Sequence, residues 1–420
     1  GSFKNGLMDS LSEGGKDLTL TIDIELQLYA QQLMNGKRGG IVAIEPSTGE
    51  ILALVTSPSY DPNMLVGRDR SKNSIFLMDP NNPEKPTYDR ALLAAYPPGS
   101  PFKMMNALIA LQENVINTET TFRCYGGYRY GSKSHNFMRC RCGIYDSPIA
   151  LKTGIAKSCN SYFSNTYKRI IEKKRKPSQG LDTWNKHATS FGLGSYLGYD
   201  LPSGAPGLIP DGKYYDDIYK YRWTASTNIS NAIGQGEVLT TPIQLANFTA
   251  AIANRGYFYT PHIVKKIDLK PIKNPEFINK KQTTINTEYF EPVVEAMHEV
   301  FKTGSGRWSQ VNGIEICGKT GTSENFVRVN GYKQQLADHS ILVAFAPKNN
   351  PKIALAVFVE NGGFGSTIAA PITSLMIEKY LNGYISEENK LRETNMLNLS
   401  LQDIYNYYRP KNKEIASRKE

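Results

Sequence analysis

The pattern of apolar and polar residues predicts strands towards both ends of the chain and helices between them. Residues 41–44 and 50–55 are short apolar runs joined by the Pro-Ser-Thr-Gly turn at 46–49, which is typical of a β-hairpin. Two later apolar runs, 340–346 and 353–359, predict further strands. Most of the intervening chain has helical periodicity. This order of elements indicates an α+β fold.

One predicted helix begins beside a serine. Residues 102–115 carry apolar side chains at helical spacing, and Pro101 takes the first helical position, where its missing N–H costs nothing. Ser100 and Lys103 then share one face, because residues i and i+3 are neighbours on a helix. A buried lysine loses its charge readily and can accept the hydroxyl proton. This is the only Ser-x-x-Lys in the chain, and it predicts a nucleophile that needs no histidine.

Lys-Thr-Gly occurs three times, and the surroundings distinguish the copies. The copy at Lys152 runs into a helical stretch, and the copy at Lys302 ends another. The copy at Lys319 instead ends the β-like run 313–318 and is followed by the later strands. A strand edge can pair with an extended peptide whose carboxylate meets the lysine and threonines. The substrate-gripping residues that we predict are Lys319, Thr320, Gly321 and Thr322.

A third polar group is needed to relay protons and hold a substrate amide. Ser-x-Asn occurs five times, but Ser158-Cys159-Asn160 lies between the other two motifs in chain order. It also joins two helix-like segments, 149–157 and 162–171, so its side chains can project into a cleft. We therefore expect Ser158 and Asn160 to complete the site.

The three motifs together resemble those of the penicillin-binding proteins, specifically class B transpeptidase domains. Ser-x-x-Lys and Lys-Thr-Gly match the family pattern, while Ser-Cys-Asn replaces the usual Ser-Asp-Asn. The resemblance covers roughly residues 17–385. It includes further family-like segments at 20–23, 40–53, 58–63, 233–237 and 241–246. The most similar branch is penicillin-binding protein 2, which acts in cell elongation.

The resemblance implies a five-stranded antiparallel sheet flanked by helices, with an all-helical lobe. It implies that Ser100 attacks the D-Ala–D-Ala carbonyl of a peptidoglycan stem peptide and that Lys103 accepts its proton. Ser158, helped by Lys319, relays a proton to the leaving D-alanine, and Asn160 holds the substrate amide. A second stem peptide resolves the acyl-enzyme without a catalytic cofactor, and β-lactam antibiotics block the serine. A membrane glycan polymerase is the implied partner.

Other activities use the same constellation. A D,D-carboxypeptidase would use water as the acceptor, and a β-lactam sensor would acylate once and signal. A serine β-lactamase would hydrolyse its acyl-enzyme, and residues 378–382 do match the Glu-x-x-Leu-Asn loop of one lactamase class. This match follows Lys319, whereas the lactamase order places it before, so we discount it. The long region before Ser100 favours a class B transpeptidase.

The five cysteines raise the question of a metal. Cys124, Cys140 and Cys142 lie in one loop-like segment with His135, and three thiolates with an imidazole suit tetrahedral zinc. The resemblance adds that penicillin-binding protein 2 relatives can carry zinc after the nucleophile helix. A disulfide from Cys124 to either neighbour is the alternative in an oxidising compartment. We expect the remaining two cysteines, Cys159 and Cys317, to be small buried residues beside the motifs.

Composition sets the remaining expectations. With 420 residues, 40% of them hydrophobic, the chain can bury one large core or two ordinary ones. Its net charge of +10 suits anionic surfaces, but the positive residues are scattered, and the run at 173–176 is typical of a solvated helix end. We therefore expect no nucleic-acid partner.

We divide the chain into a linker at 1–16 (the remnant of a preceding pedestal), a transpeptidase domain at 17–385 and a polar tail at 386–420. The tail is expected to be loosely attached, with one amphipathic helix. The resemblance places the whole protein at the periplasmic face of the inner membrane, held by an anchor outside this chain.

Overall fold

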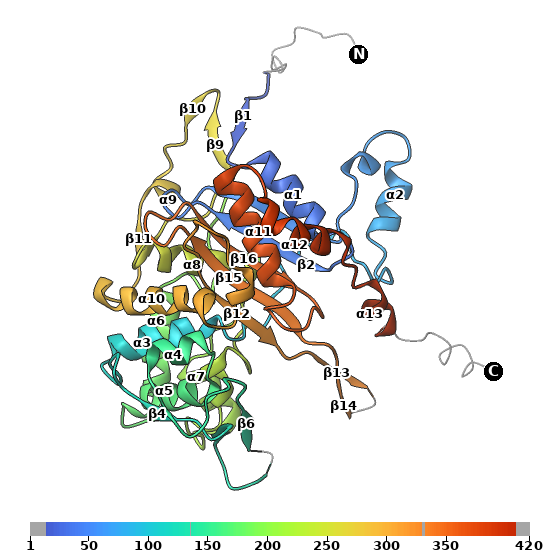
Figure 1. Cartoon of the computed structure of the whole chain (residues 1–420). Helices are drawn as coiled ribbons and strands as arrows, with labels where there is room; N and C mark the ends of the chain where they lie inside the picture. Colours follow the sequence, from blue (N-terminus) through green and yellow to red (C-terminus); the bar gives the residue numbers. More distant parts are fainter. Residues whose placement is uncertain (1–13, 135, 330–331, 409–420) are drawn as a thin grey trace, which may run out of the picture.

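A five-stranded antiparallel sheet forms the centre of the computed structural model, which describes residues 14–134, 136–329 and 332–408 (Figure 1). The strand order is β12-β15-β16-β2-β3. The strands are β12 (Cys317–Ser323), β15 (His339–Ala346), β16 (Ile353–Val359), β2 (Gly39–Ile44) and β3 (Ile51–Ser57). Strands from both ends of the chain therefore share one sheet, which confirms the predicted α+β class and sheet.

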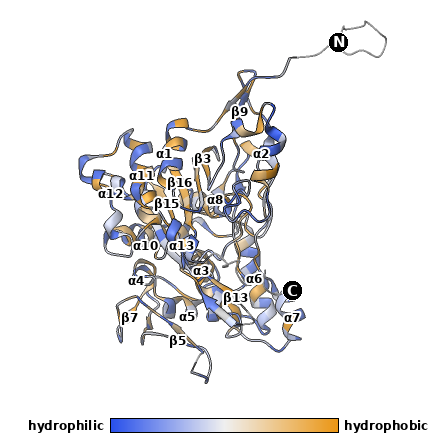
Figure 2. Cartoon of the chain, turned by 90° about the vertical axis from the view of Figure 1, so that its right-hand side faces the viewer, coloured by the Kyte–Doolittle hydropathy of each residue, from blue (hydrophilic) through white to orange (hydrophobic). Residues whose placement is uncertain are grey.

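Helices cover both faces of this sheet. Every residue of β15 and β16 is buried, as expected of strands enclosed on both sides. In the view of Figure 1, α1 (Ile24–Met34) and α11 (Ala369–Asn382) lie in front of the sheet and α8 (Pro242–Ala253) lies behind it. Figure 2 shows apolar residues gathered in the strands between these layers. The core is therefore the sheet together with the inner faces of the helices.

A helical lobe lies below the sheet in Figure 1. Its main elements are α3 (Phe102–Gln112), α4 (Leu151–Ala156), α5 (Asn160–Glu172), α6 (Pro177–Thr189), α7 (Gly212–Tyr219) and the 3₁₀ helix η2 (Ile229–Ile233). Phe102 to Leu111 are all buried, so α3 is enclosed on every side. Asn106 connects α3 to η2 and α6. Its amide donates to the carbonyls of Asn231 and Ala232 and accepts from Trp184 Nε1. The lobe thus holds the nucleophile helix in a fixed position.

Strand β12, which carries the third motif, starts later in the sequence than predicted. The predicted run 313–318 overlaps β12 only at Cys317 and Gly318, and the Lys-Thr-Gly triplet lies inside the strand. A bridge between Val311 and Ile314 closes a turn in which Gly313 has a φ of +77°. This turn uses the first half of the predicted run.

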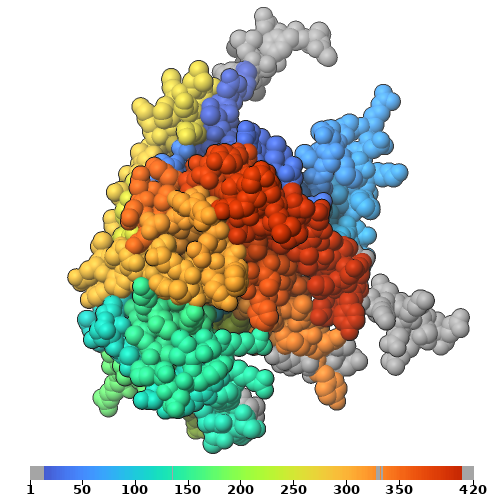
Figure 3. Space-filling view, in the orientation of Figure 1, coloured from blue at the N-terminus to red at the C-terminus, as the bar shows by residue number. Residues whose placement is uncertain are grey.

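Shorter elements surround the two main parts. Small antiparallel pairings join β1 (Leu18–Leu20) and β10 (Lys270–Pro271) to β9 (Val264–Ile267), β8 (Tyr257–Phe258) to β11 (Lys281–Gln282), β4 (Phe122–Arg123) to β7 (Pro148–Ile149), β5 (Gly127–Arg129) to β6 (Phe137–Arg139), and β13 (Phe326–Val329) to β14 (Tyr332–Gln335). The remaining helices of this set are α2 (Arg70–Leu77), α9 (Pro275–Ile278) and α10 (Phe290–Lys302), with short 3₁₀ turns η1 (Pro62–Leu65), η3 (Thr287–Tyr289) and η4 (Arg307–Ser309). Helix α2 projects from the body of the molecule (Figure 3).

After α11 the chain forms two helices, α12 (Glu387–Asn398) and α13 (Gln402–Tyr407), rather than one loosely attached helix. Buried Tyr405 anchors α13, because its hydroxyl accepts from Arg38 N at 2.8 Å and donates to Glu360 O at 3.0 Å. Such contacts with distant parts of the chain are not visible in a local polarity pattern. None of the helices within the described ranges is both long and apolar enough to cross a bilayer.

Candidate active site

The first turn of α3 presents Ser100 at the junction of lobe and sheet. Gly99 has a φ of +62°, which a glycine adopts at little cost, and the N–H of Lys103 donates to the Ser100 carbonyl at 3.0 Å. A methyl group on Gly99 would lie 3.1 Å from the carbonyl oxygen of Thr322. The nucleophile turn and the sheet edge are therefore packed directly against each other.

Residues of the first two predicted motifs form one hydrogen-bonded network. Lys103 Nζ lies 2.6 Å from Asn160 Oδ1, 3.0 Å from Ser158 Oγ and 2.9 Å from the Ser158 carbonyl. Ser158 Oγ lies 3.0 Å from Ser100 Oγ. Ser158 thus bridges Ser100 and Lys103, which we expected to meet directly. The bridge depends on a φ of +56° at Ser158, an uncommon conformation for a residue other than glycine.

Burial changes the charge state of both lysines. Complete burial lowers the pKa of Lys103 to about 8, although nearby cysteines oppose this shift. Burial also lowers the pKa of Lys319 well below its usual range, and the positive charge of Lys103 adds to this effect. A lysine with a pKa near 8 is partly neutral at physiological pH, so it can accept a proton.

The third motif lies on β12, which is an edge strand. Gly321 must lack a side chain, because a methyl group there would lie 2.6 Å from Pro101 Cδ. The carbonyl of Thr322 accepts from Gln235 Nε2 at 3.4 Å and therefore faces the lobe. In an antiparallel strand the N–H and C=O of one residue point to the same side, so the Thr322 N–H also faces the cleft. Backbone groups at this edge are thus available to an extended peptide.

These residues border a cleft of about 620 Å³. Its walls include Ser100, Ser158, Asn160, Thr320 and Thr322, together with Arg139, Arg141, Lys157, Gln235, Ser305, Glu324, Asp338 and Phe364. Several of these side chains belong to no motif that we recognised. Ser305 is one example: its hydroxyl hydrogen-bonds to Thr320 Oγ1, yet a single serine after a helix gives no signal in the sequence.

The other two Lys-Thr-Gly copies lie within a helix or at the end of one. Lys152 lies in α4 and pairs with Glu299 at 3.1 Å, and Lys302 ends α10. The discounted lactamase-like Glu378 is buried in α11, where it accepts hydrogen bonds from Ser386 and Asn389. Neither lysine nor Glu378 lines the cleft.

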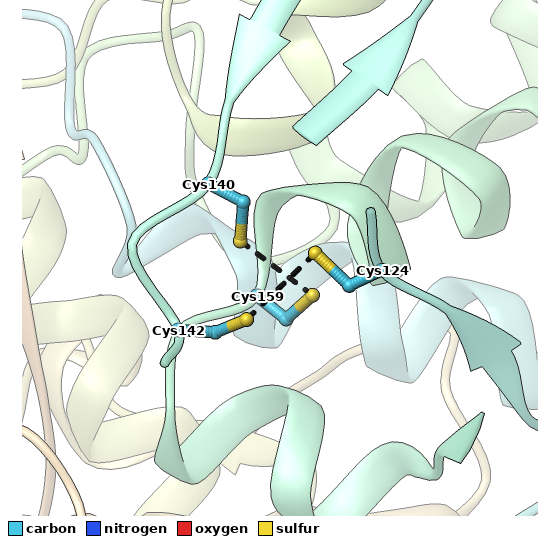
Figure 4. Close-up of side chains that lie close together, drawn as sticks. All are labelled: Cys124, Cys140, Cys142 and Cys159. Carbon is cyan, nitrogen blue, oxygen red and sulfur yellow. Dashed lines mark hydrogen bonds between the residues drawn. The ribbon is translucent and has the colours of Figure 1, made fainter. Parts of the chain in front are cut away.

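Four cysteine thiols meet beside this cleft (Figure 4). Cys140 Sγ lies 3.7 Å from Cys159 Sγ, and Cys142 Sγ lies 3.8 Å from Cys124 Sγ. All four sulfur atoms lie within 4.8 Å of one another. All five cysteines of the chain are free thiols, so the alternative disulfide from Cys124 is not formed. The predicted cysteines Cys124, Cys140 and Cys142 are thus brought together.

Cys159 is buried beside the second motif, as expected. It also contributes the fourth thiol of the cluster, which we did not predict, because the Ser158–Asn160 turn faces the 140–142 segment. The backbone N–H of Asn160 donates to Cys140 Sγ at 3.2 Å, which ties the second motif to the cluster. The predicted ligand His135 lies outside the described residues. Cys317, by contrast, is buried at the start of β12 as expected.

The sequence of the chain matches a known protein family. Residues 39–378 match the penicillin binding protein transpeptidase domain. The chain belongs to this family. Among curated proteins it is similar to the peptidoglycan D,D-transpeptidase MrdA of Acinetobacter baumannii, with 36% identity over 367 residues. The alignment covers 84% of this chain and 52% of MrdA, so the chain spans about half the length of this relative.

Solved structures of penicillin-binding proteins agree with this relationship. Penicillin-binding protein 2 of Pseudomonas aeruginosa, in complex with WCK 5153, is 33% identical, with a TM-score of 0.76 over 89% of this chain and 78% of that one. Penicillin-binding protein A of Mycobacterium tuberculosis, as a ceftriaxone acyl-enzyme, is 29% identical, with a TM-score of 0.71 over 87% of this chain and 80% of that one. Both comparisons confirm the predicted family and its transpeptidase fold.

Proposed function

We propose that this domain is a peptidoglycan D,D-transpeptidase of the elongation type, acting at the periplasmic face of the inner membrane. The observation that carries the proposal is the chain Ser100–Ser158–Lys103, with both contacts at 3.0 Å, beside an open sheet edge. This arrangement supplies a nucleophile, a proton path and a surface for an extended peptide. The family match and the name of the A. baumannii relative support the same activity.

Acylation follows from this geometry. Ser100 Oγ attacks the carbonyl carbon between the two terminal D-alanines of a stem peptide, and its proton passes through Ser158 to neutral Lys103. The new Oγ–C bond replaces the C–N bond, and the leaving D-alanine nitrogen takes the proton back from Ser158. Backbone N–H groups of Ser100 and Thr322 stabilise the oxyanion, an effect typically worth roughly 10²–10³ in rate for one donor.

Deacylation transfers the peptide to a second amine. The nitrogen of a neighbouring stem peptide attacks the ester carbon, its proton passes to the same network, and Ser100 is released as the cross-link forms. A β-lactam imitates the donor: its ring C–N bond breaks, but no acceptor resolves the ester. By the family resemblance, a membrane glycan polymerase supplies the strands that are joined.

The test separates this activity from its alternatives. Purified protein is given a stem pentapeptide as donor and a stem peptide with a free amine as acceptor, and products are identified by mass. We expect a joined peptide that has lost one D-alanine, formed by wild type and by Ser226→Ala but not by Ser100→Ala. Ser226 begins another Ser-x-Asn that does not line the cleft.

Each alternative gives a different result in this assay. Release of D-alanine without a joined peptide would make the domain a D,D-carboxypeptidase. A stable β-lactam adduct without any peptide product would favour a sensor, and rapid β-lactam turnover would favour a β-lactamase.

We also propose that Cys124, Cys140, Cys142 and Cys159 hold a structural zinc ion. In a tetrahedral site with Zn–S bonds of about 2.3 Å, sulfur atoms lie about 3.8 Å apart. Two of the sulfur pairs, at 3.7 and 3.8 Å, fit this spacing, and all four sulfur atoms lie within 4.8 Å of one another. Bound zinc would fasten the cysteine-rich segment to the start of α5 and would take no part in proton transfer.

Elemental analysis of protein purified without chelator tests the zinc proposal. We expect about one zinc per chain in wild type and in Cys317→Ser, since Cys317 is equally buried but lies outside the cluster. Cys159→Ser should contain much less zinc and unfold at a lower temperature. Zinc well below one per chain in wild type, or full zinc in Cys159→Ser, would contradict the proposal.

A further inference from the structure

The residues that follow η2 lie between the nucleophile turn and the edge of the sheet. The Gly99 N–H donates to the Gly234 carbonyl at 2.8 Å. The next residue, Gln235, donates from Nε2 to the Thr322 carbonyl at 3.4 Å and to Ser323 Oγ at 3.5 Å. This dipeptide therefore connects the nucleophile turn to the last two residues of β12.

The connecting dipeptide is itself fixed to the nucleophile helix. On α3, Asn106 donates from its side chain to the carbonyls of two η2 residues, at 3.1 and 3.0 Å. Gly234 ends η2 with a φ of +67°, and a methyl group there would lie 2.3 Å from the Gly99 carbonyl oxygen. The position of Gln235 is therefore set by the same helix that positions Ser100.

The lobe-facing side of β12 is the outer edge of the sheet, so no neighbouring strand fixes it there. Gln235 is half-buried and lines the cleft, and it reaches this edge from the lobe. A carbonyl oxygen has two lone pairs, so the Thr322 carbonyl can accept from Gln235 and still accept from a bound peptide. Gln235 thus holds the edge without closing it to a substrate.

The direction of the Thr322 carbonyl is linked to the direction of the N–H of the same residue. Both groups point to the same side of an antiparallel strand, so a twist of the strand end turns them together. The oxyanion is stabilised only when the N–H groups of Ser100 and Thr322 both reach it. Because a misplacement of about 1 Å can cost about 100-fold in rate, the distance between the nucleophile turn and β12 must be held closely.

We propose that Gln235 is a positioning residue for the oxyanion hole. By holding the end of β12 at a fixed distance from the nucleophile turn, Gln235 directs the Thr322 N–H towards the carbonyl that Ser100 attacks. It acts through the Thr322 backbone and does not touch the reacting atoms. The inference rests on the proposed function, because it assumes acyl transfer to Ser100 with Thr322 as the second oxyanion donor.

Gln235→Met tests the proposal, because methionine has a similar length but cannot donate a hydrogen bond. Acylation by benzylpenicillin is followed by rapid quenching and intact mass over a range of drug concentrations. This separates the acylation rate at saturation from the concentration that gives half of it. Gln235→Met should lower the saturated rate at least about 10-fold and leave the half-saturating concentration within about 2-fold of wild type. The matched control is Gln310→Met, since Gln310 is exposed and donates to the Arg307 carbonyl outside the cleft.

The infrared spectrum of the acyl-enzyme gives a readout that a loss of stability alone would not move. With a carbon isotope label at the β-lactam carbonyl, the frequency of the ester C=O stretch falls with each hydrogen bond that the oxygen accepts. We expect a higher frequency in Gln235→Met than in wild type and Gln310→Met. Gln235→Glu is a second variant, and it should show the same changes because its carboxylate repels the Thr322 carbonyl.

The proposal is overturned if the ester frequency of both Gln235 variants equals that of wild type. It is also overturned if their saturated rates are unchanged and only the half-saturating concentration moves. Failure of benzylpenicillin to acylate wild type would instead overturn the proposed function.

Discussion

The rate of serine acylation should depend on pH through Lys103. The lysine must be neutral to accept the proton of Ser100, and burial lowers its pKa to about 8. The neutral fraction is then about 10% at pH 7, 50% at pH 8 and 90% at pH 9. We therefore expect the rate to rise about 5-fold from pH 7 to pH 8 and less than 2-fold from pH 8 to pH 9.

The size of these steps separates a buried lysine from an ordinary one. A lysine with its usual pKa of about 10.5 would be neutral in less than 1% of molecules at pH 8, and the rate would rise about 10-fold per pH unit through pH 9. The predicted profile levels off because most Lys103 has already lost its proton.

The assay follows adduct formation with benzylpenicillin by intact mass at low drug concentration between pH 6 and pH 9.5. Drug hydrolysis without protein is subtracted at each pH, and circular dichroism checks that the fold is kept. Lys103→Arg, which stays charged, should acylate at least about 100-fold more slowly at every pH. A wild-type rate that does not change between pH 7 and pH 8, or that still rises 10-fold from pH 8 to pH 9, would refute this reasoning.

Two further predictions concern packing. Gly321→Ala places a methyl group 2.6 Å from Pro101 Cδ, so it should destabilise the domain by about 1–3 kcal/mol and slow acylation, as measured by denaturant unfolding and adduct formation. Unchanged acylation would show that β12 and the nucleophile turn can move apart freely. Tyr405→Phe removes both hydrogen bonds that anchor α13 and should cost about 1–3 kcal/mol with little change in acylation. An unchanged unfolding midpoint would contradict the tight attachment of this helix.

The sheet and the three motifs could be predicted because each has a local signal. Strands β15 and β16 are buried throughout because both faces of the sheet are covered. Their nearly continuous apolar runs can therefore be recognised in the sequence alone. Likewise, the three-residue spacing of Ser100 and Lys103 at a predicted helix start is a signal that the local sequence contains. The β-like run before it and the strands after it then selected the third Lys-Thr-Gly, which the structure places at the sheet edge.

The remaining features depend on contacts between distant segments. The position of Ser158 between Ser100 and Lys103 requires a left-handed backbone that no pattern encodes. Cys159 joined the cluster only because the turn before α5 folds onto the 140–142 segment. The attachment of α13 relies on Tyr405 reaching backbone groups more than 40 residues away. In each case tertiary packing, rather than local propensity, sets the outcome.

The intact mass of the protein after incubation with benzylpenicillin tests the central claim most directly. The account predicts a stable adduct of one drug molecule per chain that persists for hours in wild type and is absent in Ser100→Ala. An adduct that still forms in Ser100→Ala, or the absence of any adduct and any drug turnover in wild type, would contradict the assignment of Ser100 as the acylated nucleophile.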